Sequence, residues 1–393
     1  MPHELMIGLG IILLVSIIAD WIGQRTALPR VTLLVLIGVG VGPSGLNWLP
    51  QAVHEASELI ATLALTMIAF LLGSELSGEK LRAHGRKVLT LSFAVVIVTF
   101  AIVGGGLALI GAPLVVAIVL GAVATATDPA ATQDVVSEVG SKGEFGGLLL
   151  GIVAVDDAWG LIIFGFAIGA IAALNGAGDG GLATLAVHLG GAVAVGIGTG
   201  VPMALLSGRM KPGRPSLLEA IGFVLVCGGL AVWIGASFLL AATIAGALVA
   251  NLARHHAYTF RQIEHFEWPF VTVFFVLAGA MLDIRMLAIS GIFGAGYLVF
   301  RVLGRLMGGW AGGVISGLSL RESGWLGMSL LPQAGVAVGM ALLAATEFPE
   351  YGETILAVTV GGTVVFEVLG PIVTRYALKT ASGPGHAAAR KRT

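Results

Sequence analysis

The stretch Ala154-Val-Asp-Asp-Ala-Trp-Gly160, which holds Asp156 and Asp157, lies in the middle of an apolar run from Phe145 to Ala173. The run is long enough to cross a bilayer as a helix, which needs about 20 apolar residues. A carboxylate at the centre of a membrane helix costs about 3 kcal/mol even on the gentler insertion scales. A span that keeps two adjacent aspartates is therefore expected to use them.

The composition of the whole chain indicates a membrane protein. Of its 393 residues, 57% are hydrophobic and 11% are charged, and the mean hydropathy is +0.98. Soluble domains carry about 25% charged residues, so a water-soluble core does not account for this chain. Because the apolar residues come in long runs, we expect helical spans rather than barrel strands. The single Cys227 excludes a disulfide framework.

Apolar runs separated by polar or Gly/Pro breaks predict an all-α polytopic membrane protein with thirteen transmembrane helices. The first run lacks a basic start and a small-residue cleavage site, so we expect a span there and not a cleaved signal. The predicted spans cover residues 4–23, 31–48, 56–76, 88–110, 112–139, 145–173, 182–208, 215–233, 235–253, 264–283, 286–316, 320–346 and 352–379.

The distribution of positive charge predicts the orientation of the spans. Lysine and arginine gather in the connections after odd-numbered spans, and Arg285 is the exception after an even-numbered one. Cytoplasmic loops are the ones enriched in these residues. We therefore expect the N-terminus outside and the C-terminus in the cytoplasm.

The spans also predict an internal repeat. Two sets of six, at about 4–173 and 215–379, are joined by a linker span at 182–208, which starts the second set from the opposite side. This is the topology of two inverted six-helix repeats. Residues 1–379 are thus expected to form one transmembrane domain, and residues 380–393 a short basic tail.

The fifth span of each repeat contains a proline, Pro129 or Pro332. A proline removes a backbone donor and frees carbonyl groups, which at membrane depth must face protein or a wet cavity. We expect two broken helices, although two simple kinks are the alternative. Near the first break, Thr127 and Asp128 offer oxygen ligands of the kind that small hard cations prefer; alternatively, Asp128 only caps the half-helix that begins at Pro129.

Few ionisable residues remain at membrane depth, where functional groups are expected. They are Asp128, Asp134, Asp156, Asp157, Arg301, Arg305 and Glu367. Asp156 and Asp157 are about 100° apart on a helix, so they face different partners. We expect Arg305 to pair with Asp156 and keep it ionised, which leaves Asp157 to exchange a proton for a cation. A purely structural ion-pair network is the alternative.

Arg301 lies four residues before Arg305, on the same helix face. Glu367 is predicted to neutralise Arg301, in a structural role. No phosphate-binding loop, metal-ligand cluster or nucleophile elbow is visible in the sequence, which argues against an ATP-driven pump and against an enzyme. Gly176-Ala-Gly-Asp179 matches a motif of intramembrane aspartyl proteases, but it lies in a polar outer loop where a protease aspartate is out of place.

Three motifs together resemble the monovalent cation/proton antiporter superfamily with the NhaA-like fold, and most of all its thirteen-helix NapA-like branch. They are Val155-Asp156-Asp157, Thr127-Asp128-Pro129 and Leu303-Gly304-Arg305. The resemblance implies crossed broken helices in a mobile core, alternating access, and a homodimer formed through approximately spans 1–3 and 8–10. It also implies that Asp157 carries either a proton or a cation, with Asp128 and Thr127 nearby.

Departures from the family pattern bear on ion coupling. Electrogenic members with paired aspartates usually have lysine where this chain has Arg305, and arginine does not readily give up its proton. We therefore expect electroneutral exchange, for which Thr127-Asp128-Pro129 is also typical. Gln333 and Gly335 are neutral where several sodium exchangers carry charge after the proline, so the sequence leaves Na⁺ and K⁺ both open.

The sequence thus predicts a secondary-active antiporter of a prokaryotic inner membrane that exchanges Na⁺ or Li⁺ for H⁺. The alternatives are a K⁺/H⁺ efflux antiporter of the same fold, an organic-anion/sodium symporter of a related fold, an intramembrane protease and a passive channel. We expect no cofactor besides the transported Na⁺ or K⁺ and H⁺. The expected partners are monovalent cations, protons, membrane lipid and a second copy of the chain, with no nucleic acid.

Overall fold

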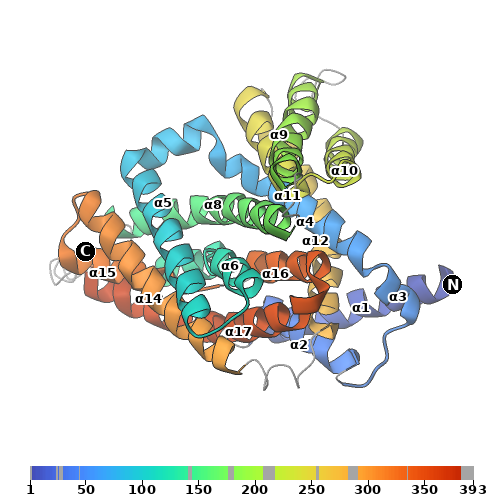
Figure 1. Cartoon of the computed structure of the whole chain (residues 1–393), viewed down its shortest axis with the longest axis horizontal. Helices are drawn as coiled ribbons and strands as arrows, with labels where there is room; N and C mark the ends of the chain where they lie inside the picture. The colour runs from blue at the N-terminus through green and yellow to red at the C-terminus, as the bar shows by residue number, and fades with distance from the viewer. Residues whose placement is uncertain are drawn as a thin grey trace.

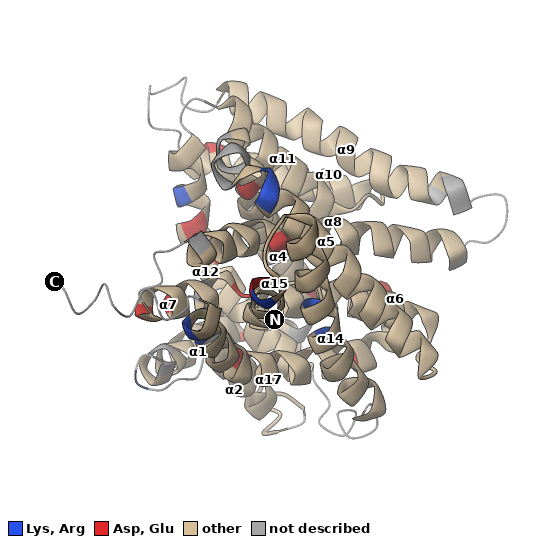
Figure 2. Cartoon of the chain, turned by 90° about the vertical axis from the view of Figure 1, so that its left-hand side faces the viewer, with Lys and Arg blue, Asp and Glu red and all other residues tan. Residues whose placement is uncertain are grey.

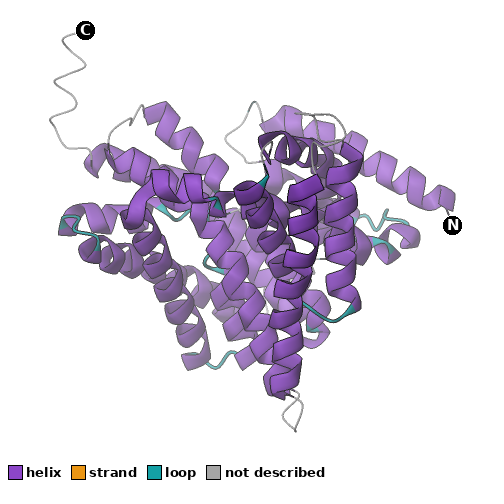
Figure 3. Ribbon diagram, turned by 90° about the horizontal axis from the view of Figure 1, so that it is seen from above, coloured by secondary structure: helices purple, strands orange, loops and turns teal. Residues whose placement is uncertain are grey.

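The computed structural model is built of helices joined by short loops (Figure 3). It describes residues 2–23, 25, 30–43, 45–139, 144–175, 181–206, 217–253, 256–281, 291–333 and 335–381, and these ranges contain no strand. The predicted all-helical class is therefore confirmed.

The helices follow the predicted order along the chain. In the first half they are α1 (Pro2–Gly23), α2 (Arg30–Val41), α3 (Gln51–Glu55), α4 (Ser57–Gly73), the 3₁₀ helix η1 (Ser74–Leu76), α5 (Gly78–Leu109), α6 (Leu114–Val123), α7 (Pro129–Val139), α8 (Glu144–Asn175) and α9 (Gly181–Leu206). In the second half they are α10 (Leu217–Trp233), α11 (Phe238–Leu252), α12 (His256–Ala280), α14 (Gly291–Ile315), α15 (Leu320–Ser329), α16 (Gly335–Glu347) and α17 (Pro349–Ala381).

The helices have the length and composition of membrane spans. Within the described ranges, 7 helices are long and apolar enough to cross a membrane, and α6, α10, α11 and α16 are shorter apolar helices. Charged residues are sparse along the ribbon (Figure 2). Large apolar side chains such as Trp233, at 81% exposed, and Ile315, at 70%, cover the outer surface, as expected of helices that face lipid.

The predicted end of α2 is wrong. The helix ends at Val41 and not at residue 48. Gly42 precedes Pro43, and proline disfavours helical backbone in the residue before it. The chain then turns back through Asn47, whose φ of 52° lies in the left-handed region.

The predicted start of α12 is also wrong. The helix begins at His256 and not at residue 264, and its first turns are polar, with Thr259 and Ile263 buried. Hydropathy detects the apolar part of a helix and misses an amphipathic extension of this kind. Upstream of the predicted start of α5, Gly85 has a φ of 74° and interrupts the helical backbone.

The two interrupted helices are present and they cross. α6 ends at Val123 and α7 begins at Pro129, while α15 ends at Ser329 and α16 begins at Gly335. The backbone N–H of Asp128 donates to the carbonyl of Pro332 at 3.0 Å. The two breaks therefore lie against each other, and the alternative of two simple kinks is wrong.

Helix α8, which carries both aspartates, runs through the middle of the molecule with α9 on one side and α17 on the other (Figures 1 and 2). Helix α14, which carries both arginines, packs closely against α5 through a row of glycines spaced four residues apart. A Cβ on Gly304 would lie 2.9 Å from the Cα of Thr99, and one on Gly308 would lie 2.8 Å from the Cα of Val95. Small residues let membrane helices approach in this way, and the approach holds the arginines at the level of the breaks.

Candidate ion-binding site

The first break exposes backbone carbonyls that no helix can satisfy, because Pro129 lacks an N–H and cannot continue the preceding turn. Two arginines of α14 satisfy them. Arg305 donates through Nη2 to the carbonyls of Ala124 at 3.2 Å and Ala126 at 3.0 Å, and also to that of Thr125. Both arginines are fully buried, and guanidinium groups suit this task because they present five donors in a fixed geometry.

Arg301 joins the two breaks. Its Nε donates to the carbonyl of Ala124 at 3.2 Å and its Nη2 to that of Ala126 at 2.9 Å, while Nη1 donates to Leu331 in the second break at 2.7 Å. Its guanidinium carbon lies 4.3 Å from the centre of the Phe366 ring. Arg301 thus takes part in backbone recognition at both broken helices.

The predicted neutralisation of Arg301 by Glu367 is wrong. Within the described residues, neither carboxylate oxygen of Glu367 has a hydrogen-bond partner, although the side chain is only 1% exposed. The physical reason is that the freed carbonyls already supply acceptors to Arg301. The sequence suggested the arginines needed an anion each, but a broken helix provides partial negative charge of its own.

Asp156 is held in a charged network. Its Oδ2 accepts a hydrogen bond from Nη1 of Arg305 at 2.6 Å, in an ion pair whose side chains are both fully buried. The hydroxyl of Thr127 donates to the same oxygen. The expected contact between Asp156 and Arg305 is therefore present, and the guanidinium is the counter-charge of this carboxylate.

Asp157 has different surroundings, although it is the next residue. Its Oδ1 accepts the backbone N–H of Thr127 at 3.1 Å, and the side chain is 1% exposed. Among the described residues no arginine or lysine forms an ion pair with Asp157. One neutral donor does not compensate a buried negative charge, so this carboxylate needs a proton or a cation.

Asp128 lies between the two breaks. Its N–H bonds to Pro332, its carbonyl accepts the hydroxyl of Thr132 at 2.8 Å, and its side chain is 8% exposed. Asp128 thus directly precedes α7, and the carboxylates of Asp128 and Asp157 interact electrostatically. The break brings together Thr127, Asp128, Asp156 and Asp157, as the sequence led us to expect.

The second break carries no charge. Nε2 of Gln333 donates to the carbonyl of Val123 at 3.2 Å and to the hydroxyl of Tyr297 at 2.8 Å. Gly335 begins α16, where a Cβ would lie 2.6 Å from the Phe275 ring. Gln333 and Pro332 therefore face the first break, and Gly335 lets α16 approach α12.

Sequence reasoning missed Tyr297. It is fully buried and lies one and two turns before Arg301 and Arg305 on the same face of α14. The four-residue spacing was the available signal, because a tyrosine in line with two buried arginines is expected to reach the same polar network.

Other predicted charges lie away from the breaks. Asp134, which the sequence places later on the same helix as Asp128 toward the cytoplasm, is exposed on α7. Glu138 forms an ion pair with Arg375, and both side chains are about half exposed, at 60% and 46%. Asp179, in the protease-like motif, lies outside the described residues. Within the described residues no three His, Cys, Asp or Glu side chains cluster as they do in a resident metal site.

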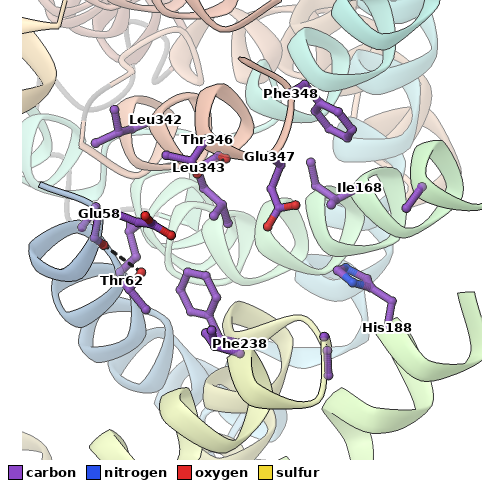
Figure 4. Close-up of a pocket in the computed structure, with 16 residues that line it drawn as sticks. Glu58, Thr62, Ile168, His188, Phe238, Leu342, Leu343, Thr346, Glu347 and Phe348 are labelled. Atoms are coloured by element: carbon purple, nitrogen blue, oxygen red, sulfur yellow. Dashed lines mark hydrogen bonds between the residues drawn. The ribbon is translucent and has the colours of Figure 1, made fainter. Parts of the chain in front are cut away.

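A separate pocket of about 270 Å³ opens near the far end of α8 (Figure 4). Glu58, Thr62, His188 and Glu347 line it together with apolar side chains such as Ile168. Ile168 follows Asp157 by eleven residues, which is about 16 Å along a helix. This pocket is thus separate from the site of the paired aspartates, neither of which lines it.

Comparison with known proteins agrees with this arrangement. The family model described as "Sodium/hydrogen exchanger, transmembrane" matches residues 10–379. The chain belongs to this family of exchangers. The predicted class of transporter is thereby confirmed, and the alternative of an intramembrane protease is wrong.

Two curated relatives align with most of the exchanger. The ammonium/H⁺ antiporter subunit AmhT of Alkalihalophilus pseudofirmus is 25% identical over 380 residues, which is 93% of this chain and 94% of the relative. The Na⁺/H⁺-K⁺ antiporter GerN of Bacillus cereus is 24% identical over 382 residues, which is 93% of this chain and 95% of the relative.

Solved structures show the fold. The exchanger is similar to the sodium proton antiporter MjNhaP1 from Methanocaldococcus jannaschii at pH 8, with a TM-score of 0.73, 21% identity, and coverage of 98% of this chain and 99% of that chain. A second structure of MjNhaP1, from electron microscopy, gives a TM-score of 0.60 at 20% identity, with coverage of 97% and 96%. The antiporter fold with crossed broken helices is thus confirmed.

Proposed function

We propose that this exchanger swaps Na⁺ or Li⁺ for H⁺ at Asp157, one for one, by alternating access. The observation that carries the proposal is the difference between the two adjacent aspartates. Asp156 has a guanidinium counter-charge at 2.6 Å, whereas Asp157 has one backbone N–H at 3.1 Å. A buried carboxylate of the second kind is neutralised by a proton or by a cation, and the two compete for it.

Oxygen ligands for the cation lie beside Asp157. The Asp128 carboxylate and the backbone and hydroxyl oxygens at Thr127 belong to the same break, and carboxylate, carbonyl and hydroxyl oxygens are hard ligands suited to small cations. When the cation leaves, a proton on Asp157 restores a neutral site that can cross between the two sides of the membrane. As the pH falls, protons compete more strongly, so the apparent KM for the cation rises.

Arg305 supports electroneutral coupling. It keeps its proton at every physiological pH, and here it is fixed by Asp156 and by carbonyls of the break. Asp156 and Arg305 therefore stay charged as a pair throughout the cycle. Only Asp157 then changes its occupant, which gives one proton per monovalent cation and no net charge transfer.

K⁺ and NH₄⁺ are the second candidate ions. The names of the two curated relatives include ammonium for AmhT and Na⁺, H⁺ and K⁺ for GerN. The neutral second break, with Gln333 and Gly335, adds no charge that selects the smallest cations. We keep Na⁺ and Li⁺ as the first expectation, because the site offers two carboxylates close together.

The setting of the exchanger is part of the proposal. We place it in a prokaryotic inner membrane as a homodimer, with the N-terminus outside and the C-terminus in the cytoplasm. The charge alternation along the chain supports the orientation.

The test is exchange in proteoliposomes with an imposed pH gradient and a panel of Na⁺, Li⁺, K⁺ and NH₄⁺. We expect Na⁺ and Li⁺ to drive proton flux, Asp157→Asn to abolish it, and Glu138→Gln to leave it unchanged as a matched carboxyl-to-amide control. Unchanged flux in Asp157→Asn contradicts the assignment of Asp157. Flux with K⁺ or NH₄⁺ alone contradicts only the choice of ion.

A further inference from the structure

Glu367 is a buried acid that the exchange mechanism above does not use. It lies on α17, it is 1% exposed, and both of its oxygens lack a hydrogen-bond partner within the described residues. Neither Arg301 nor Arg305 donates a hydrogen bond to Glu367. Arg301 donates to backbone carbonyls, and Arg305 donates to Asp156 and to the first break. An ionised carboxylate in such surroundings is strongly disfavoured, so Glu367 holds a proton in this conformation.

Thr359, Thr363 and Glu367 lie on one face of α17 and form a buried polar stripe. Thr363 and Thr359 precede Glu367 by one and two turns, they are 3% and 0% exposed, and their hydroxyls also lack partners. Other helical threonines of the chain donate to the carbonyl four residues earlier, among them Thr243 and Thr374. Thr359 and Thr363 do not, so their buried hydroxyls, like the carboxyl of Glu367, lack a hydrogen-bond partner within the described residues.

Glu367 is coupled electrostatically to the proposed ion site. Helix α17 packs against α2, α6, α7, α8, α14, α15 and α16, and Asp128, directly before α7, acts electrostatically on Glu367. On α14, Arg301 lies over the ring of Phe366, the residue before Glu367, but its donors are directed to the breaks. Asp128 in turn interacts with Asp157. A negative charge on Glu367 therefore changes the electrostatic potential at the carboxylates that are proposed to bind the cation.

We propose that Glu367 is a second proton-binding carboxyl, which sets the cation affinity of the exchanger. With its proton, Glu367 is neutral and the site holds the negative charges of the first break alone. When the O–H bond of the acid breaks and the proton passes to water, Glu367 adds negative potential at Asp128 and strengthens cation binding. The proposal rests on the proposed function for the identity of the cation site, but Glu367 itself is not a cation ligand and its proton does not cross the membrane.

The protonation of Glu367 is tested by infrared difference spectroscopy of the purified protein. Protonated carboxylic acids show a carbonyl band that ionised carboxylates lack. We expect absorption in this band at a pH where exposed carboxylates are ionised, with contributions from Asp157 and Glu367. Glu367→Gln should remove part of this absorption, and Glu138→Gln should remove none. A band that is unchanged in Glu367→Gln overturns the proposal. Glu367→Met, which is apolar and of similar size, is the second variant if the amide does not fold.

The effect on affinity is tested by measuring the apparent Kd for Na⁺ over a range of pH. By linkage, the slope of log Kd against pH counts the protons released on binding. We expect log Kd to fall by well over one unit per pH unit in the wild-type protein and by about one unit in Glu367→Gln, since only Asp157 then releases a proton. Equal slopes overturn the role of Glu367 and leave the proposed function standing. No pH dependence in the wild-type protein overturns the proposed function, while the infrared band still reports on Glu367.

Discussion

The two interrupted helices meet at one point of the molecule, but different groups bond to the freed backbone atoms at each break. At the first break, carbonyls of residues 124–126 accept from two arginines, and carboxylates follow within a few residues. At the second break, Leu331 accepts from Arg301, Pro332 accepts from a backbone N–H, and Gln333 supplies an amide. Both segments therefore share the architecture of an interrupted helix, while the carboxylate of Asp128 belongs to the first break and the second break has the neutral Gln333.

The largest expected effect is at Arg305, which belongs to the first break alone. Arg305→Met removes the donors to the break and leaves Asp156 as an uncompensated buried charge. Removal of one partner of a buried ion pair costs about 3–5 kcal/mol, and we expect this loss in the free energy of unfolding measured by denaturation in detergent. The double variant with Asp156→Asn should recover part of the loss, because it removes the stranded charge. A cost below about 1 kcal/mol would contradict the network.

Arg301 is expected to have the next largest effect, because it binds both breaks. Arg301→Met leaves the carbonyls of Ala124, Ala126 and Leu331 with fewer donors. Hydrogen bonds to charged groups contribute about 1.5–3 kcal/mol, so we expect a loss of about 3 kcal/mol in the same assay. Arg301→Lys is the matched control for charge, and it should recover little, since an ammonium group cannot span three carbonyls in fixed geometry. Full recovery by lysine would show that charge alone matters there.

Gln333 tests the neutral break. Gln333→Leu leaves the carbonyl of Val123 and the hydroxyl of Tyr297 unpaired, at a cost of about 2 kcal/mol. Because no carboxylate is lost, we expect the apparent KM for the cation to stay close to the wild-type value. A double-mutant cycle with Tyr297→Phe should give a coupling of about 0.5–3 kcal/mol. Loss of exchange in a folded Gln333→Leu would contradict the claim that cation exchange depends on the first break and not on the second.

The smallest effect is expected at the start of the second interrupted helix. The hydroxyl of Ser319 accepts the N–H of Glu322 at 3.2 Å, while Glu322 accepts the N–H of Ser319 at 3.1 Å, which is a capping box for α15. Ser319→Ala should cost about 1 kcal/mol of unfolding free energy with unchanged exchange. Ser319→Asp, which keeps a capping oxygen, is the control and should cost less.

The sequence alone predicted the order of the helices and most of the charged residues that meet at the first break. Apolar runs located the spans, and Pro129 and Pro332 located the two breaks, because both signals are local. The partner of Arg301 was not predictable, since it depends on three carbonyls from two distant segments. Tyr297 was missed because its bond to Gln333 is a tertiary contact. The end of α2 was missed although the Gly42-Pro43 step within the apolar run is a local signal.

The central claim is that a cation displaces the proton of Asp157, and it is tested most directly by proton release from the purified exchanger in weakly buffered detergent solution. Addition of Na⁺ should release protons from the wild-type protein and from Glu138→Gln. Asp157→Asn should release none, while it remains folded because an amide fits the buried site without charge. Proton release from Asp157→Asn equal to that of the wild-type protein would contradict the account.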